Sequence, residues 1–110
     1  MTRKKVGING FGRIGRNLFR IVKQNYDSEL EVVAINDLAD INTSAHLFRY
    51  DSTYGTYKGS VDVDDNTLVI DGNKLSVFNE VNPDNIPWAS VGVDIVIEST
   101  GKFVNAIGDS

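Results

Sequence analysis

The glycine-rich stretch GFGRIG, residues 10–15, constrains the fold of this 110-residue chain more than any other feature of its sequence. The run before it, Lys5 to Asn9, has the apolar residues of a short strand, and a helical pattern begins at Arg13. Glycine accepts backbone conformations and close approaches that other residues do not. The sequence therefore predicts a tight turn that leads from a strand directly into a helix.

The helix after this turn should bury one side and expose the other. Its apolar residues follow the spacing of a single stripe, which we expect to face the core: Ile14, Leu18, Ile21 and Val22. We expect its polar residues on the solvent side: Arg16, Asn17, Arg20 and Lys23. A second, shorter helix should run through Phe48, with Asn42 or Thr43 as its N-terminal cap.

Three further segments complete the predicted sheet. Leu30 to Asp37 is rich in β-branched residues and has a continuous apolar run from Val32 to Ile35, which is typical of a parallel strand covered on both faces. Ser60 to Glu80 alternates between apolar and polar residues around the turn signal Asp71-Gly72, so it should form antiparallel hairpins. Val93 to Gly101 is another strand of the buried type. We predict an α/β fold with a β-α-β unit, an antiparallel insertion and a further parallel strand.

The three glycines match the pattern G-x-G-x-x-G of dinucleotide-binding β-α-β units, and the flanking strand and helix strengthen an otherwise weak match. Gly10 permits the tight turn, Gly12 lets a pyrophosphate approach the backbone, and Gly15 lets the helix lie close to the strand. The amides around Arg13 and Ile14, at the positive end of the helix dipole, should face the phosphates. The alternative is a purely structural glycine turn.

Asp37 ends the second predicted strand, at about the 20-residue spacing that this fingerprint requires. Its carboxylate should accept hydrogen bonds from the adenosine ribose and repel a 2′-phosphate, so the sequence favours NAD over NADP. Glu98 to Gly101 ends the last predicted strand, where ligands of open α/β sheets also bind. There the alternative is a capped turn.

Composition excludes several other classes of protein. The net charge of −4 and the pI near 4.8 argue against nucleic acid as a partner, and no apolar stretch is long enough for a membrane span. The N-terminus runs into a strand and not into a signal-peptide core, so we expect a cytoplasmic protein. The chain contains no cysteine, which rules out thiol catalysis by these residues, and its single histidine, His46, is better explained by helix packing. No metal site is predicted.

Several linked motifs are similar to those of one enzyme family. The segments INGFGRIGR, AINDL, YDSTYG and IPWASVGVDIVIESTG, followed by Phe103, closely resemble the phosphorylating glyceraldehyde-3-phosphate dehydrogenases. The resemblance implies a Rossmann-type, NAD-binding domain from a cytoplasmic, tetrameric glycolytic enzyme. In that family the aldehyde is oxidised through a thioester, hydride passes to NAD, and phosphate releases the acyl group.

The resemblance also assigns roles to individual positions. The pyrophosphate loop would comprise Asn9, Gly10, Gly12, Arg13 and Ile14, with Gly15 behind it. The other cofactor-binding positions would be Asn36, Asp37, Glu80, Ser99, Thr100, Gly101 and Phe103. Val81 and Asn82 depart from the Arg and Asp that commonly follow this glutamate in the family, so the resemblance does not carry the family's contact from the Arg to the adenine over to this chain.

By this resemblance residues 1–110 are a partial NAD-binding domain without the catalytic domain, the nucleophilic Cys or the base His. We therefore expect the chain to bind the ADP-ribose half of NAD, or other adenine nucleotides, and not to catalyse. Its last strand would leave an open apolar edge through Val93, Ile95 and Ile97, which favours a dimer or a swap. The alternatives are an edge covered by the C-terminal tail and, for function, a non-catalytic nucleotide-binding or surface interaction module.

Overall fold

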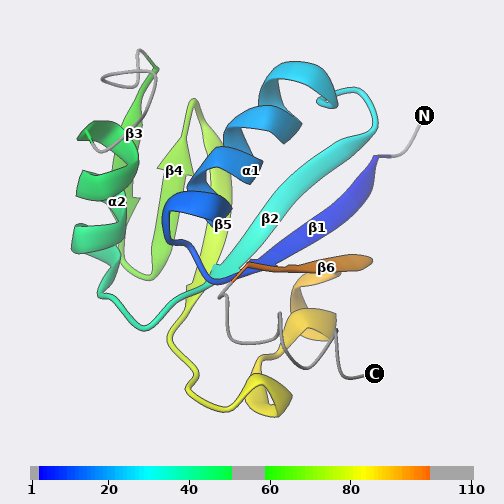
Figure 1. The fold of residues 1–110 in the computed structure, drawn as a ribbon, viewed down its shortest axis with the longest axis vertical. Coiled ribbons are helices and arrows are strands. Elements are labelled where there is room, and N and C mark those ends of the chain that lie inside the picture. Colours follow the sequence, from blue (N-terminus) through cyan, green and yellow to red (C-terminus); the bar gives the residue numbers. More distant parts are fainter. Residues whose placement is uncertain (1–2, 51–58, 100–110) are drawn as a thin grey trace.

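The computed structural model of the chain describes residues 3–50 and 59–99. Within these residues a single sheet has the strand order β3-β4-β5-β2-β1-β6 (Figure 1). Its strands are β1 Lys4–Asn9, β2 Leu30–Asn36, β3 Val61–Asp64, β4 Thr67–Ile70, β5 Asn73–Phe78 and β6 Ile95–Glu98.

The centre of the sheet is parallel and one side of it is antiparallel. β1 pairs in parallel with β2 and β6, and β2 pairs in parallel with β5. β3, β4 and β5 form the two predicted hairpins. This confirms the α/β, Rossmann-type sheet with an antiparallel insertion. The parallel strands all end at one edge of the sheet, and the candidate site lies at that edge.

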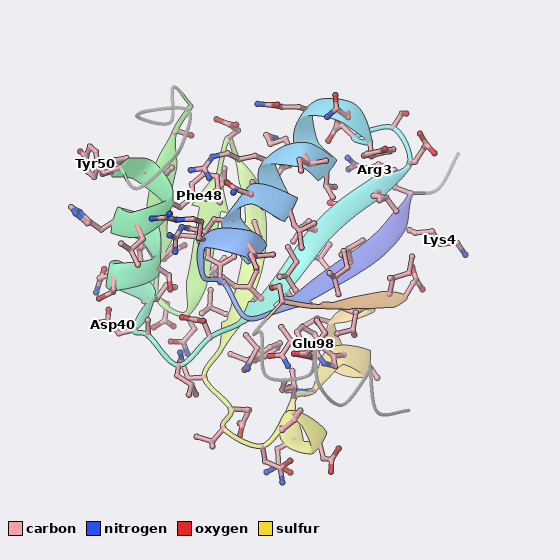
Figure 2. All side chains as sticks on the ribbon, viewed as in Figure 1. Arg3, Lys4, Asp40, Phe48, Tyr50 and Glu98 are labelled. Atoms are coloured by element: carbon pink, nitrogen blue, oxygen red, sulfur yellow. The ribbon has the colours of Figure 1, made fainter. Side chains whose placement is uncertain are left out.

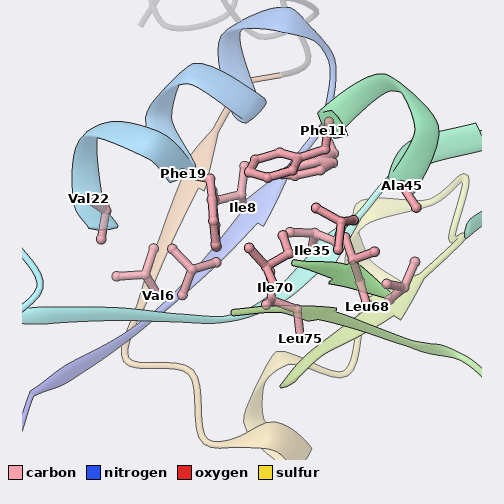
Figure 3. Packing of buried hydrophobic residues seen from close by; sticks show 14 residues of the cluster. Val6, Ile8, Phe11, Phe19, Val22, Ile35, Ala45, Leu68, Ile70 and Leu75 are labelled. Atoms are coloured by element: carbon pink, nitrogen blue, oxygen red, sulfur yellow. The ribbon is translucent and has the colours of Figure 1, made fainter. Parts of the chain in front are cut away.

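Two α-helices cover one face of the sheet, α1 Arg13–Asn25 and α2 Ile41–Tyr50. Phe19 of α1 and Phe48 of α2 pack with strand residues such as Val6 and Ile8 in one buried cluster (Figure 3). The opposite face carries Trp88, in the second of two short 3₁₀ segments, η1 Pro83–Asn85 and η2 Trp88–Val91. A Cβ on Gly7 of β1 would lie 2.6 Å from the Trp88 ring, so the indole packs directly on the strand.

The predicted buried face of α1 is wrong in part. Ile14 is 62% exposed and Ile21 is also exposed, whereas Arg16 and Arg20 are only 4% and 5% exposed. The reason is that this helix also faces α2 and the glycine turn, where an arginine stem can pack and its head can find oxygen acceptors. Arg20 donates to the Phe48 carbonyl at 2.5 Å, and its guanidinium carbon lies 4.4 Å from the centre of the Phe48 ring.

The predicted cap of α2 is also wrong. Asp40 precedes the helix (Figure 2), and its carboxylate accepts the N–H groups of Asn42 at 2.8 Å and Thr43 at 3.1 Å. It also accepts the Thr43 hydroxyl at 2.9 Å. An aspartate at this position satisfies amide donors that the first turn leaves without partners. The sequence offered several good capping residues in succession, and only the backbone path selects the first. His46 is exposed and lies beside Tyr50 in the same helix, with ring centres 4.9 Å apart.

β6 is the terminal strand of the described sheet, and Ile95 and Val96 are exposed there. It pairs with β1 on one side, from Val6 opposite Ile95 to Asn9 opposite Glu98. The predicted strand is therefore present, but in the described structure it is not buried as its apolar composition had suggested. In the described part of the chain, no helix has the length and apolar character needed to cross a membrane.

Candidate functional site

A cleft of about 270 Å³ opens at the carboxyl ends of the parallel strands. The residues that line the cleft lie at the ends of the strands or in the segments that follow them, and the glycine turn lies among them. The cleft is lined by Asn9, Gly10, Gly12, Asn36, Asp37, Leu38, Glu80, Val81, Pro83 and Ser99. The segments that meet here are far apart in sequence, and the sheet brings them together.

The three glycines of the turn have different structural environments. Gly10 has φ 98°, a conformation that side chains disfavour. A Cβ on Gly15 would lie 2.1 Å from the Gly10 carbonyl oxygen and 3.0 Å from Ser99 Oγ, so only glycine lets α1 pack this close. A Cβ on Gly12 would meet no atom of the described residues within 4 Å. Gly12 therefore faces open space at the cleft, while Gly10 and Gly15 are required by the turn itself.

Phe11, between the first two glycines, anchors the turn. Its ring is buried, stacks on Phe48 at 5.9 Å between centres, and meets the edge of Phe19. Its N–H donates to Asp37 Oδ1 at 3.1 Å and its carbonyl accepts from Arg16 Nη1 at 3.2 Å. Side chain, amide and carbonyl are thus all held, so the backbone at Gly12 is fixed before any ligand binds.

Asp37 begins the loop after β2 and is half-buried in the cleft wall. One carboxylate oxygen accepts the Phe11 N–H, and the other accepts the Ala39 N–H at 3.2 Å. Its backbone is held as well, since its N–H donates to the Phe78 carbonyl and its carbonyl accepts from Asn79 Nδ2. Each carboxylate oxygen retains a lone pair for a further donor in the cleft.

Asn9 and Asn36 are each 5% exposed, and their carboxamides are hydrogen-bonded within the protein. Asn36 Nδ2 donates to Asn9 Oδ1 at 3.0 Å, and Asn9 Nδ2 donates to both carboxylate oxygens of Glu98, at 2.9 and 3.0 Å. Asn36 also holds the backbone of Glu80, through the Glu80 N–H at 2.9 Å and the Glu80 carbonyl at 3.2 Å. These bonds cross four segments of the sheet edge.

Comparison with known protein families identifies this arrangement. The family model described as "Glyceraldehyde 3-phosphate dehydrogenase, NAD binding domain" matches residues 4–106. The chain belongs to this family.

Relatives named glyceraldehyde-3-phosphate dehydrogenase are close in sequence over nearly the whole chain. That of Geobacillus stearothermophilus is 56% identical over 99 residues, which are 90% of this chain and 29% of the relative. The enzyme of Thermotoga maritima is 50% identical over 101 residues, 92% of this chain and 30% of the relative. That of Kluyveromyces lactis, named glyceraldehyde-3-phosphate dehydrogenase 1, is 56% identical over 100 residues, 90% of this chain and 30% of the relative. The chain thus spans about 30% of the length of these relatives.

The structure brings together seven of the residues that the glyceraldehyde-3-phosphate dehydrogenase resemblance assigned to the cofactor. Those that line the cleft are Asn9, Gly10, Gly12, Asn36, Asp37, Glu80 and Ser99. Arg13, Ile14 and Gly15 lie at the start of α1, outside the lining. The remaining three, Thr100, Gly101 and Phe103, lie outside the described residues, and so does the motif YDSTYG after its first residue, Tyr50.

Several residues of the site were missed by sequence reasoning. Leu38 and Pro83 line the cleft beside Val81, and all three are apolar residues that follow strand ends. Phe11 occupies a variable position of the glycine motif, where its aromatic side chain in an otherwise small and polar turn was a detectable signal. Glu98 was predicted as part of the ligand-binding strand end, but its bonds to Asn9 were not, because they depend on the register that places it opposite Asn9.

Proposed function

We propose that this chain binds NAD in the cleft through the cofactor's ADP-ribose half, as the family's NAD-binding domain. The observation that carries the proposal is the juxtaposition of an open glycine and a carboxylate across one cleft. Gly12 leaves space at the helix start, and Asp37 stands on the neighbouring wall. A diphosphate and its adjoining ribose need these two features at neighbouring positions.

The start of α1 suits a diphosphate. Gly12 is the N-cap and offers no side chain to cap the helix, and the first turn contains no acidic residue. Amide donors of a first helical turn lack intrahelical acceptors, and the helix dipole places partial positive charge there. Phosphate oxygens can accept from these amides, and no competing carboxylate has to be displaced.

Asp37 suits an unmodified ribose. Its carboxylate is held in position by two backbone amides, so its orientation is set before the ligand arrives. The remaining lone pairs can accept from the two ribose hydroxyls, whereas a 2′-phosphate would meet a like charge. This supports NAD over NADP.

The adenine is proposed to lie against the apolar residues at the outer part of the cleft. Val81 is 78% exposed and Leu38 is also exposed, and both line the cleft with Pro83. Burial of such side chains under a flat base removes apolar area from water. Val81 would thus supply an apolar contact where a guanidinium commonly covers the base in the family.

The activity of a whole glyceraldehyde-3-phosphate dehydrogenase is proposed only for a longer protein of which this sequence would be a part. These 110 residues contain no cysteine, so they cannot form a thioester, and we expect no turnover from them alone. We also propose a cytoplasmic location and, for the longer enzyme, a homo-oligomer. Thr100, Gly101 and Phe103 stay predicted members of the cofactor wall.

Calorimetric titration with NAD and with ADP-ribose tests the proposal. The two should bind with similar affinity, because the described residues proposed to hold the cofactor all contact its ADP-ribose half. Asp37→Ala should weaken both by about tenfold, the loss of roughly one charge-assisted hydrogen bond. Asp62→Ala, which removes an exposed carboxylate on β3, is the matched control and should leave both unchanged. Absence of binding, or an effect of Asp62→Ala as large as that of Asp37→Ala, would contradict the proposal.

The exposed edge of β6 favours a second, non-catalytic property, association with another copy of the chain. β6 ends the described sheet, and Ile95 on it is exposed, whereas Ile97 packs partly against the core. A strand with a free hydrogen-bonding edge and apolar side chains pairs readily with a second strand. We therefore propose a two-fold dimer or a swap through Ile95 and Ile97 of β6 together with Val93, which precedes the strand.

A further inference from the structure

Hydrogen bonds link four segments at the sheet edge, and the side-chain amides of two of them each donate toward Glu98 for a physical reason. In the parallel register Asn36 lies opposite Asn9, and Asn9 lies opposite Glu98. Residues opposite each other in neighbouring strands point to the same face of the sheet. The register alone therefore places two carboxamides and one carboxylate in a row, here called the amide row: Asn36, Asn9 and Glu98.

A carboxamide can be turned over, with its oxygen and nitrogen exchanged, so its own shape does not fix which end donates. An ionised carboxylate can only accept. Glu98 accepts from Asn9 Nδ2 with both oxygens, which leaves Asn9 Oδ1 as the acceptor for Asn36 Nδ2. Asn36 Oδ1 is then directed to the N–H of Glu80. The Glu98 carboxylate thus sets the orientation of the Asn9 carboxamide, and Asn9 in turn sets that of Asn36.

At the end of the amide row away from Glu98, Asn36 contacts a wall of the cleft. Asn36 makes a two-point contact with the Glu80 backbone, accepting its N–H and donating to its carbonyl. Glu80, Val81 and Pro83 line the cleft, whereas Glu98 does not. If Asn36 were turned over, its nitrogen would face the Glu80 N–H, and two donors would oppose each other at 2.9 Å. The position of this wall thus depends on a residue at the other side of the site.

We propose that Glu98 is a positioning residue: through the amide row it sets the orientation of Asn9 and Asn36 and so holds the Glu80 segment in place for the nucleotide. The inference rests on the proposed binding of NAD in the cleft. Glu98 itself lies at the end of β6, at the edge of the sheet (Figure 2), and acts without contact to the ligand.

Glu98→Gln is the informative substitution, because it keeps the shape of the side chain and removes the obligatory acceptor. Loss of a negative charge would by itself favour an anionic ligand. The amide row predicts the opposite, an affinity for ADP-ribose weaker by about fivefold, since one charge-assisted bond is lost and the amides are no longer held in one orientation. Glu29→Gln is the matched control, with the same charge change in an exposed residue before β2.

A second substitution, at position 9, should reverse the effect of Glu98→Gln on the affinity for ADP-ribose. In Asn9→Asp a carboxylate would face Glu98, and binding should weaken. In the double variant Asn9→Asp/Glu98→Gln, the glutamine amide can donate to Asp at position 9, which still accepts from Asn36. Glu98→Gln should therefore weaken binding in the natural background and strengthen it in the Asn9→Asp background. A change of the same sign in both backgrounds would overturn the proposal.

NMR of the ligand-free chain separates this proposal from the proposed function. Glu98→Gln should shift the Glu80 backbone amide and the Asn36 side-chain amide resonances, through the Asn9 carboxamide that donates to Glu98. Glu29→Gln should shift neither. Shifts in the absence of any ADP-ribose binding would leave the amide row intact and refute the nucleotide site. Unshifted resonances would refute the amide row, even where the natural sequence binds ADP-ribose.

Discussion

Substitution by alanine should lower the stability of the fold at Gly15, whereas at Gly12 it should weaken nucleotide binding and leave stability nearly unchanged. A Cβ on Gly15 would lie 2.1 Å from the Gly10 carbonyl oxygen, where real Cβ contacts essentially never fall under 3.0 Å, so α1 and the turn must separate by about 1 Å. The Gly10 carbonyl cannot move freely, since Gly10 also donates its N–H to the Asn36 carbonyl at 2.7 Å. The clash is therefore between two backbone elements that other contacts hold in place.

The expected loss follows from two opposing contributions. Overpacking of this kind costs about 1–3 kcal/mol, and a backbone partner that cannot rotate away favours the upper part of that range. Alanine in a helix is intrinsically favoured over glycine by about 1 kcal/mol. Gly15→Ala should therefore lower the free energy of unfolding by about 2 kcal/mol and the thermal midpoint by about 10 °C.

Thermal and urea unfolding, followed by far-ultraviolet circular dichroism, measure this loss. Gly12→Ala is the control, because its Cβ would meet nothing within 4 Å in the part of the chain that the structure describes, and its φ of −78° suits alanine. It should change stability by less than about 0.5 kcal/mol and still weaken nucleotide binding, since the methyl group projects into the cleft. A Gly15→Ala variant as stable as the natural sequence, or equal losses in both variants, would refute the reasoning.

Two further predictions concern α2 and β6. The Thr43 N–H, the Thr43 hydroxyl and the Asn42 N–H hold the pKa of the Asp40 carboxyl below its usual value. A lowered pKa in the folded state adds stability that is present above the unfolded-state pKa and lost as the pH falls through the folded-state value. Urea midpoints from about pH 5 to about pH 2 should therefore fall less steeply in Asp40→Ala than in the natural sequence; parallel curves would contradict this. For β6, Ile95→Lys should reduce self-association in light scattering, because a charge at a strand edge opposes pairing, and an unchanged dimer fraction would exclude this edge.

The order of the elements was predictable because each depends on local pattern. The glycine turn, the strand predicted at Leu30 to Asp37 with its apolar run, and the Asp71-Gly72 hairpin all carry their signal within a few residues, and the structure confirms them. The buried face of α1 was not predictable in the same way. Periodicity assigns Ile14 to the core and Arg16 to water, but the burial of Arg16 depends on a carbonyl of the neighbouring turn that no helical pattern reveals.

In the candidate site, too, the features that depend on local sequence were predictable and those that depend on contacts between distant segments were not. The motif spacing placed Gly12 and Asp37 correctly at one cleft, because a strand-turn-helix unit fixes their relation. The carboxamides of Asn9 and Asn36 were expected to face a cofactor, and both line the cleft, yet their hydrogen bonds are made within the protein. Such cross-strand bonding depends on register between segments that are distant in sequence, which one sequence does not specify.

The most direct test of the nucleotide site is a crystal structure of the chain with NAD bound. The diphosphate should lie over Gly12 at the start of α1, and the adenosine ribose hydroxyls should lie within hydrogen-bonding distance of the Asp37 carboxylate. A nucleotide bound elsewhere, or a cleft in which side chains of the protein occupy the space at Gly12, would contradict the account.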